Sequence, residues 1–286
     1  MMLTPRQIAA VVGPALDEDA PWGDLTSAAF IPADARATAA LVSRVEGVFS
    51  GGSLFAAAFE LTDPTCRIDL RMPDGAAIRS GDVLATVDGP ARAVLTAERV
   101  GLNFAQRMSG IATLTRRYVD AVAGTSARIA DTRKTTPGLR MLERQAVRDG
   151  GGRNHRFSLS DAVMLKDNHL GILTADGTGL TDALRRAMAR LPHTTHVEVE
   201  VDRVDQIEPV LAAGIDTIML DNFSLDDLRR GVALVAGRAT VEASGGVSLD
   251  SVRAIAETGV DVISVGALTH SAPALDLGLD LVVDAH

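Results

Sequence analysis

Cysteine is almost missing from this chain, since Cys66 is its one cysteine. A single thiol permits neither a disulfide within the chain nor a thiolate metal cluster. Aromatic residues make up only 3% of the sequence, and the formal net charge is −9. The basic surface and the stacking side chains of a nucleic-acid-binding protein are therefore lacking, and no binding to nucleic acid is expected.

Long apolar runs are lacking as well. No stretch of roughly 18 apolar residues predicts a membrane span, and the N-terminus has no basic start followed by an apolar core and a cleavage site. We therefore expect a cytoplasmic protein without a signal peptide or membrane association. Its 286 residues, 47% of them hydrophobic, are enough for one large domain or two modest ones.

Lysine is also scarce. Of the 28 lysine and arginine residues, only Lys134 and Lys166 are lysines. A bias toward arginine codons explains arginine on the surface. It does not explain why both lysines lie in the stretch richest in charge and glycine. An ammonium is a compact point charge and a guanidinium a planar fork, so we expect these two lysines to have roles that arginine cannot fill.

The first half of the chain predicts a small antiparallel sheet. Residues 34–49 and 66–70 alternate as strands do, and residues 72–90 contain short strands broken by Asp-Gly, Ser-Gly and Gly-Pro turns. A lipoyl-type carrier has a similar pattern but needs an exposed lysine in a turn, which this half lacks. Residues 91–123 have a helical period, and we expect two helices broken near Ser109 and Gly110.

The second half alternates strands with helices. Short apolar strand candidates start near residues 127, 162, 196, 216, 240 and 261, and helical stretches separate them. This order predicts a parallel sheet with right-handed crossovers. We favour a (β/α) barrel with its site at the carboxyl ends of the strands. A doubly wound open sheet is the alternative, but no glycine-rich dinucleotide fingerprint follows an early strand.

The strand candidate at 196–201 carries two carboxylates on one face. His196, Glu198 and Glu200 alternate with valines, so they would point into the barrel, with the carboxylates about 6–7 Å apart. Each needs a cation, a metal or a ligand, because burial of an unpaired charge is costly. For Glu198, which lies deeper, a structural salt bridge remains open. Glu200 lies nearer the carboxyl end, where we expect a functional role.

Further acidic and basic side chains are expected at the same rim. Asp221 ends the next strand, where Ser224 is the better helix cap, and Glu242 and Ser244 end the one after. Carboxylates there suit ribose hydroxyls or Mg²⁺ bound to pyrophosphate. Strand ends and a glycine-rich turn supply the cations that a dicarboxylate needs: Arg133, Lys134, Arg140, His155, Arg156 and Lys166. A solvated charged face is the ordinary alternative.

Glycine-containing loops follow the last two strands, at residues 244–246 and 264–268. Their backbone N–H groups and the helix that follows favour an anion. Barrels often bind phosphate in these two loops. The pair therefore predicts a phosphate site.

These segments, in this order, resemble the quinolinate phosphoribosyltransferase family, also named nicotinate-nucleotide pyrophosphorylase (carboxylating). The resemblance rests on DTRKTTPGLR, GGGRNHR, LSDAVMLKDNH, EVEV, IMLDN, EASGG and VGALTHS, and earlier on EDAPWGDLTS and LTAER. It covers essentially the whole chain, and no departure occurs at the positions that carry function in the family.

The resemblance implies an α/β fold with an N-terminal α/β sandwich domain at 1–110 and an open (β/α) barrel of about seven strands at 111–286. Whether the tail LDLVVDAH folds back on the first domain stays open. The family is homodimeric, with Arg99 reaching the partner's site. The implied activity is that of a pentosyltransferase. Quinolinate and phosphoribosyl pyrophosphate give nicotinate mononucleotide, pyrophosphate and CO₂, a step of de novo NAD biosynthesis.

Site residues follow from the same resemblance, position by position. Lys134, Glu200 and Asp221 would be catalytic, and Glu200 and Asp221 would hold Mg²⁺ with pyrophosphate; no organic cofactor is expected. Substrate contacts would come from the following residues: Arg99, Thr132, Arg133, Lys134, His155, Arg156, Lys166, Glu200, Asp221, Ser244, Gly245, Gly246, Val265, Gly266 and Ala267.

Two other readings remain. The nearest is a paralogue of the same family associated with molybdate transport, whose reaction is less settled, and quinolinate turnover or its absence separates the two. A non-catalytic barrel that only binds phosphorylated metabolites is the second, but anion storage needs no carboxylates at the rim.

Overall fold

The computed structural model describes residues 3–282, which form two compact units. Unit 1 contains the described residues up to Arg116 together with 135–151 and those from Leu268 onward, and unit 2 contains 117–134 and 152–267. The sequence-based boundary at residue 110 stays a prediction. None of the helices in the described part has the length and apolar character that a membrane crossing needs.

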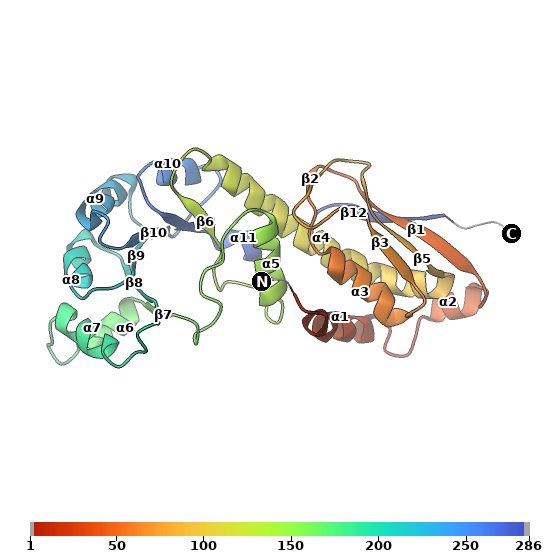
Figure 1. Cartoon of the computed structure of the whole chain (residues 1–286), viewed down its shortest axis with the longest axis horizontal. Coiled ribbons are helices and arrows are strands. Elements are labelled where there is room, and N and C mark those ends of the chain that lie inside the picture. The colour runs from red at the N-terminus through yellow and green to blue at the C-terminus, as the bar shows by residue number, and fades with distance from the viewer. Residues whose placement is uncertain (1–2, 283–286) are drawn as a thin grey trace. The chain divides into compact units, whose positions relative to one another are not determined.

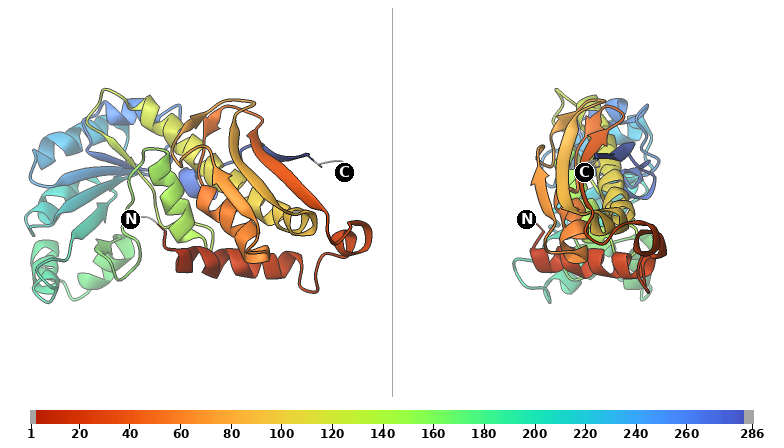
Figure 2. Two further views of the ribbon diagram at one scale, coloured as in Figure 1. Left: turned by 45° about the vertical axis from the view of Figure 1, so that its right-hand side comes forward. Right: turned by 90° about the vertical axis from the view of Figure 1, so that its right-hand side faces the viewer.

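Unit 1 is built on a four-stranded antiparallel sheet in the order β12-β1-β5-β3. Its strands are β1 (Arg36–Ser43), β3 (Arg67–Leu70), β5 (Val83–Pro90) and β12 (Leu277–Val282), and β2 (Gly47–Val48) pairs separately with β4 (Ala77–Ile78). Burial alternates along β1, as the sequence pattern predicts for a sheet with one covered face. Figure 2 shows β1 and β5 side by side.

The helices of unit 1 begin and end where capping chemistry allows. Thr4 and Gln7 form a capping box at the start of α1 (Pro5–Asp19), with Pro5 in the first turn. Asp24 caps the short helix α2 (Leu25–Phe30). The other helices of this unit are α3 (Gly52–Thr62), the first part of α4 (Ala91–Ala121), α5 (Arg140–Asp149) and most of α11 (Ala267–His270).

The prediction of two helices broken near Ser109 and Gly110 is wrong, because α4 is continuous from Ala91 to Ala121. Both residues lie at close contacts. A Cβ atom at Gly110 would come within 1.9 Å of the Pro273 carbonyl oxygen, and Ser109 Oγ donates to the Ser50 carbonyl oxygen. Here glycine serves close packing against a neighbouring segment, a requirement that the local sequence does not reveal.

Unit 2 is a parallel sheet in the order β6-β11-β10-β9-β8-β7. The strands are β6 (Arg128–Ala130), β7 (Val163–Leu165), β8 (Val197–Val201), β9 (Thr217–Asp221), β10 (Thr240–Ser244) and β11 (Val262–Ser264). All six lie where the sequence predicts strands. Arg153 adds an isolated parallel bridge to Ala130 beyond β6. The arrangement is an open α/β barrel.

Helices cover one side of this sheet (Figure 1). They are α6 (Asp167–Leu173), α7 (Leu180–Met188), the 3-10 turn η1 (Val204–Gln206), α8 (Ile207–Leu211), α9 (Leu225–Val235) and α10 (Val252–Ala256). In β8, Glu198 is buried, and so are Val197 and Val199, which precede and follow it in the sequence. Apolar side chains from the strands fill the space under the helices, and the polar residues of β8 face the barrel interior.

Candidate active site

Opposite charges meet at the carboxyl ends of β7 and β8. Lys166 directly follows β7, and its Nζ forms an ion pair with Glu200, the fourth residue of β8. The Lys166 side chain is half exposed, whereas 13% of the Glu200 side chain is exposed. Glu200 thus has a cation beside it, one of the three kinds of partner (a cation, a metal or a ligand) expected for a carboxylate at this position.

A cavity of about 250 Å³ lies at this end of unit 2 and contains both predicted metal ligands. Its lining consists of Asp167, Leu170, Glu200, Asp202, Gln206, Asp221 and Asn222. Asp221 ends β9 in register with Ser244 of β10, and Ser224 caps α9, so Asp221 is not used as a cap. Carboxylate and amide oxygens are ligands that Mg²⁺ prefers, so the donor set fits this ion.

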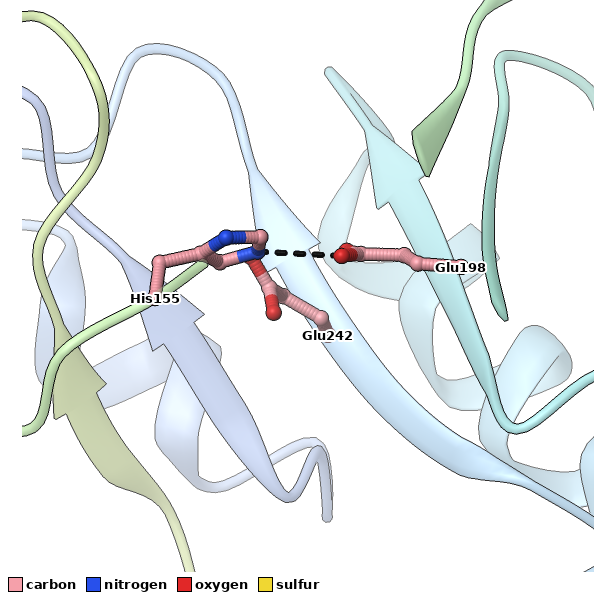
Figure 3. A group of neighbouring side chains, drawn as sticks. All are labelled: His155, Glu198 and Glu242. Atoms are coloured by element: carbon pink, nitrogen blue, oxygen red, sulfur yellow. Dashed lines mark ion pairs between the residues drawn. The ribbon is translucent and has the colours of Figure 1, made fainter. Parts of the chain in front are cut away.

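A second charged group lies inside the barrel and consists of His155, Glu198 and Glu242 (Figure 3). His155 Nε2 is 3.0 Å from Glu198 Oε2 and 3.5 Å from Glu242 Oε1. Burial opposes a charge on the ring, but the hydrogen bond to Glu198 and the negative charges of Glu198 and Glu242 outweigh it and raise the pKa of His155 to about 10. Burial is also the main cause that raises the pKa of Glu198.

The backbone contact at Nδ1 determines which ring nitrogen carries the hydrogen when the imidazole is neutral. The Arg156 backbone N–H donates to His155 Nδ1 over 2.7 Å, and an imidazolium has no lone pair there to accept it. Nε2 therefore carries the proton that faces Glu198. The raised pKa of His155 follows from the negative charge of two buried carboxylates beside one ring.

The larger cavity of unit 2, about 640 Å³, lies at the amino ends of the strands. Strand-initial residues line it, among them Arg128, Thr217, Thr240 and Val262, together with His155, Arg156, Glu198 and Glu242. His155, predicted to bind a substrate carboxylate, thus directs Nε2 toward the barrel interior. Volume alone does not identify the reaction site, since the predicted metal ligands Glu200 and Asp221 line the smaller cavity.

Two guanidinium groups lie near each other at the positions predicted for a dicarboxylate. Burial and the charge of Arg133 both lower the pKa of Arg156, and Arg133 Nε is buried without a hydrogen-bond partner. Arg156 also donates from Nη1 to the Ala162 carbonyl oxygen over 2.9 Å. Like charges at close range are unfavourable without an anion, so this pair favours a dianionic ligand.

Asp131 is a residue that the sequence reasoning missed. This fully buried carboxylate follows β6 and accepts hydrogen bonds from the His155 backbone N–H at 2.7 Å and from Asn154 Nδ2 at 2.6 Å. It thereby fixes the segment that carries His155 and Arg156. The sequence did contain a signal for Asp131, because it directly follows the strand candidate ARIA, at the carboxyl end where functional polar residues of a barrel are expected.

The remaining predicted residues lie on loops and on α4. Arg99 is exposed on α4 in unit 1, and Lys134 is exposed after β6, with its backbone N–H 3.1 Å from Thr132 Oγ1. Gly245 and Gly246 have positive φ angles after β10, and Gly245 has no room for a Cβ atom beside Asn222. Residues 265–267 follow β11 at the same end of the sheet.

Comparisons with known proteins agree over both halves of the chain. Residues 24–109 match the model for the N-terminal domain of quinolinate phosphoribosyl transferase, and residues 111–280 match that for its C-terminal domain. A nicotinate-nucleotide pyrophosphorylase [carboxylating] from Mycobacterium leprae is 44% identical, covering 93% of this chain and 94% of the relative. A probable enzyme of the same name from Bacillus subtilis is 43% identical, covering 93% and 90%.

Solved structures give the same result. The crystal structure of NadC from Streptococcus pyogenes is 40% identical, with a TM-score of 0.94 over 100% of both chains. The nicotinate-nucleotide pyrophosphorylase from Francisella tularensis is 36% identical, with a TM-score of 0.91 over 98% of both chains. Fold and sequence therefore agree along nearly the whole chain.

Proposed function

This chain belongs to the quinolinate phosphoribosyltransferase family, and from that premise we propose that it joins quinolinate to phosphoribosyl pyrophosphate. The products are nicotinate mononucleotide, pyrophosphate and CO₂, so the enzyme is a pentosyltransferase of NAD biosynthesis. The observation that carries the proposal is the meeting of Lys166, Glu200 and Asp221 at the carboxyl ends of adjacent parallel strands. Reaction sites of (β/α) barrels lie at this end.

Quinolinate is a dianion, and the guanidinium pair of Arg133 and Arg156 supplies matching charge. A guanidinium binds a carboxylate through two parallel hydrogen bonds, which orients the ring as well as holding it. Lys166 is the third cation, but in the structure its ammonium is paired with Glu200. Binding of the substrate carboxylate would draw Lys166 away from Glu200 and leave that carboxylate available to the sugar.

Glu200 and Asp221 face the phosphoribosyl donor in this scheme. As pyrophosphate departs, the ribose C1 atom becomes cationic, and two fixed carboxylates stabilise that charge without reorganisation. The same oxygens would bind Mg²⁺, which when bound neutralises the pyrophosphate charge. Lys134, which is exposed and follows Arg133 in the sequence, would lie between the quinolinate ring and the phosphoribosyl group.

The bond changes need no protein nucleophile. The quinolinate nitrogen forms a bond to C1 while the bond from C1 to pyrophosphate breaks. The resulting pyridinium withdraws electrons, so the bond to the adjacent carboxyl carbon breaks, CO₂ leaves and a proton replaces it on the ring. The protein contributes alignment, which is worth several kcal/mol in such reactions, and electrostatic stabilisation.

A homodimer with Arg99 acting on the partner's site is part of the proposal. Trp22, Leu25 and Phe30 are 94%, 84% and 81% exposed, an apolar surface that favours coverage by another chain. Asp24 in this segment accepts a hydrogen bond from Thr96, three residues before Arg99 on α4. Side chains three residues apart share a helix face, so a partner that covers this surface would also meet Arg99.

The decisive experiment supplies purified protein with quinolinate, phosphoribosyl pyrophosphate and Mg²⁺. We expect nicotinate mononucleotide, pyrophosphate and CO₂ in equal amounts, and none of them when quinolinate is omitted. Nicotinate, which lacks the 2-carboxylate, serves as the matched control and should react poorly. Tight quinolinate binding without pyrophosphate release would refute the proposal.

A further inference from the structure

The group formed by His155, Glu198 and Glu242, here called the interior cluster, has no role in the mechanism above. Three elements contribute to it: the segment after β6, β8 and β10 (Figure 3). Each carboxylate residue is 3% exposed. A cluster built from distant parts of the chain and buried so completely requires charge compensation.

Hydrogen bonding leaves this cluster incompletely satisfied. Glu198 Oε1 and Glu242 Oε1 are both buried and have no hydrogen-bond partner. The ring of His155 serves Glu198 Oε2 at 3.0 Å, while Glu242 Oε1 lies 3.5 Å away without a hydrogen bond. Buried carboxylate oxygens are normally paired or coordinate metals, so these two atoms indicate a cation.

The tautomer of His155 determines which kind of cation fits. Because Nδ1 accepts the Arg156 N–H, Nε2 carries a hydrogen and cannot ligate a metal. The ring instead holds Glu198 in place, as partners of ligating carboxylates commonly do. Two carboxylate oxygens without a nitrogen or sulfur ligand suit Mg²⁺ or Mn²⁺ rather than Zn²⁺.

The dimensions agree with such an ion. One donor atom from each residue of the interior cluster lies within 4.8 Å of the others. Two oxygens on opposite sides of an octahedral Mg²⁺ are about 4.2 Å apart, a spacing of the same size. Both carboxylates line the cavity of about 640 Å³, which has room for the remaining water ligands and includes the exposed residues Arg128 and Arg153.

The positive groups in that cavity favour anions and work against a cation. Arg156 directs Nη1 to the Ala162 carbonyl oxygen, and Arg128 and Arg153 are exposed, so solvent screens them. The two carboxylates lie deeper and in contact with the same ring. At their position the local charge is negative, because one histidine ring cannot offset two carboxylates.

We propose that the interior cluster binds one divalent cation, Mn²⁺ or Mg²⁺, between Glu198 Oε1 and Glu242 Oε1, with water completing its shell. This site differs from the one at Glu200 and Asp221, because the two pairs line separate cavities. The bound ion fixes β8, β10 and the His155–Arg156 segment to one another, which is a positioning role.

The test uses metal-free protein and Mn²⁺ alone, without substrates. Crystals of the unmodified protein soaked in Mn²⁺ should give an anomalous scattering peak between Glu198 and Glu242. In solution, Mn²⁺ binding followed by electron paramagnetic resonance should persist in the double variant Glu200→Gln, Asp221→Asn. Adding Glu242→Gln to that background should weaken Mn²⁺ binding at least about tenfold.

Other outcomes would overturn the proposal. A single anomalous peak beside Glu200 and Asp221 would place all metal binding at the other cavity. A Mn²⁺ peak within ligand distance of His155 Nε2 would mean that the tautomer argument is wrong. Two results together would show that the carboxylates share a proton instead. These are Mn²⁺-soaked crystals of the unmodified protein without an anomalous peak, and a Glu242→Gln variant with a higher melting temperature than wild type. The crystal experiment does not depend on whether the Glu242→Gln variant folds.

Discussion

At the scale of single residues, the proposed catalytic role of Lys134 gives the clearest test. Lys134 follows β6 directly after Arg133 and is exposed. We expect Lys134→Ala to lower kcat about 100-fold, as loss of one pre-placed charge does, with a much smaller effect on the melting temperature. Steady-state kinetics and thermal unfolding measure both.

The control for this substitution is Lys134→Arg. A planar guanidinium cannot reproduce a point charge at the same place, so this variant should stay well below wild-type turnover. Full activity of Lys134→Arg would show that any cation suffices and that the scarcity of lysine is only a codon effect.

Glu200 should matter for turnover far more than for stability. Its ion pair with the half-exposed Lys166 is worth at most about 1 kcal/mol. We therefore expect Glu200→Gln to reduce kcat about 100-fold through loss of charge opposite the ribose carbon. Denaturant unfolding checks the stability, and pre-steady-state pyrophosphate release checks the chemistry. Normal release with slow turnover would assign Glu200 to a later step.

Asp149 predicts a pH dependence of stability in unit 1. Burial raises the pKa of this carboxyl, although Ser50 and Gln145 donate hydrogen bonds to it. The folded state thus binds its proton more tightly than the unfolded chain, so stability is lost as pH rises through the folded pKa. Asp149→Asn should raise the melting temperature at pH 7.5 and have little effect near pH 4.

Asp63 serves as the opposite case. Hydrogen bonds from Thr65 lower the pKa of this exposed carboxyl, so its contribution is present at neutral pH and is lost as pH falls. Asp63→Asn should therefore lower the melting temperature slightly at pH 7.5. If both variants shifted the melting temperature in the same direction, burial would not be the cause at Asp149.

At the scale of elements, α4 shows how a neighbouring segment overrides local preference. Alanine is ordinarily better than glycine inside a helix by about 0.5–1 kcal/mol. At Gly110 the added methyl group would meet the Pro273 carbonyl oxygen at 1.9 Å, so we expect Gly110→Ala to destabilise the protein by about 1–3 kcal/mol. Gly171→Ala in α6 has open space around it and should stabilise it instead.

The predicted elements of unit 2 are right because their signals are local. Strands such as β8 and β9 are short apolar runs bounded by polar residues, and Ser224 marks the start of α9 in the sequence itself. The direction of His155 is not local, since it depends on carboxylates from β8 and β10 and on Asp131. The resemblance therefore named the residue without revealing where its ring points.

The whole molecule is expected to work as a dimer, and mixing of inactive variants tests this. Arg99→Ala and Lys166→Ala each disable one component of a shared site. Mixed dimers contain one intact site, so an equal mixture should regain about a quarter of wild-type activity. Lys166→Ala mixed with Glu200→Gln is the control, because both residues lie in one unit and no intact site forms. Recovery in the control mixture would argue against the shared site.

Strand pairing in unit 1 joins parts of the chain that are far apart, which sequence pattern alone does not predict. β12 pairs antiparallel with β1, and the ion pair of Arg44 with Asp280 bridges 236 residues. The described part of the tail thus returns to the first domain's sheet, and residues 283–286 lie outside the described residues.

This late pairing has a consequence for biosynthesis. On the ribosome, β1 emerges long before β12, and until then the backbone groups along one edge of β1 have no partner. Such an exposed edge is a template for association with another nascent chain. Unit 2 contains no segment beyond Ala267. A holding chaperone that binds β1 until translation ends would raise the yield of native protein without touching the barrel.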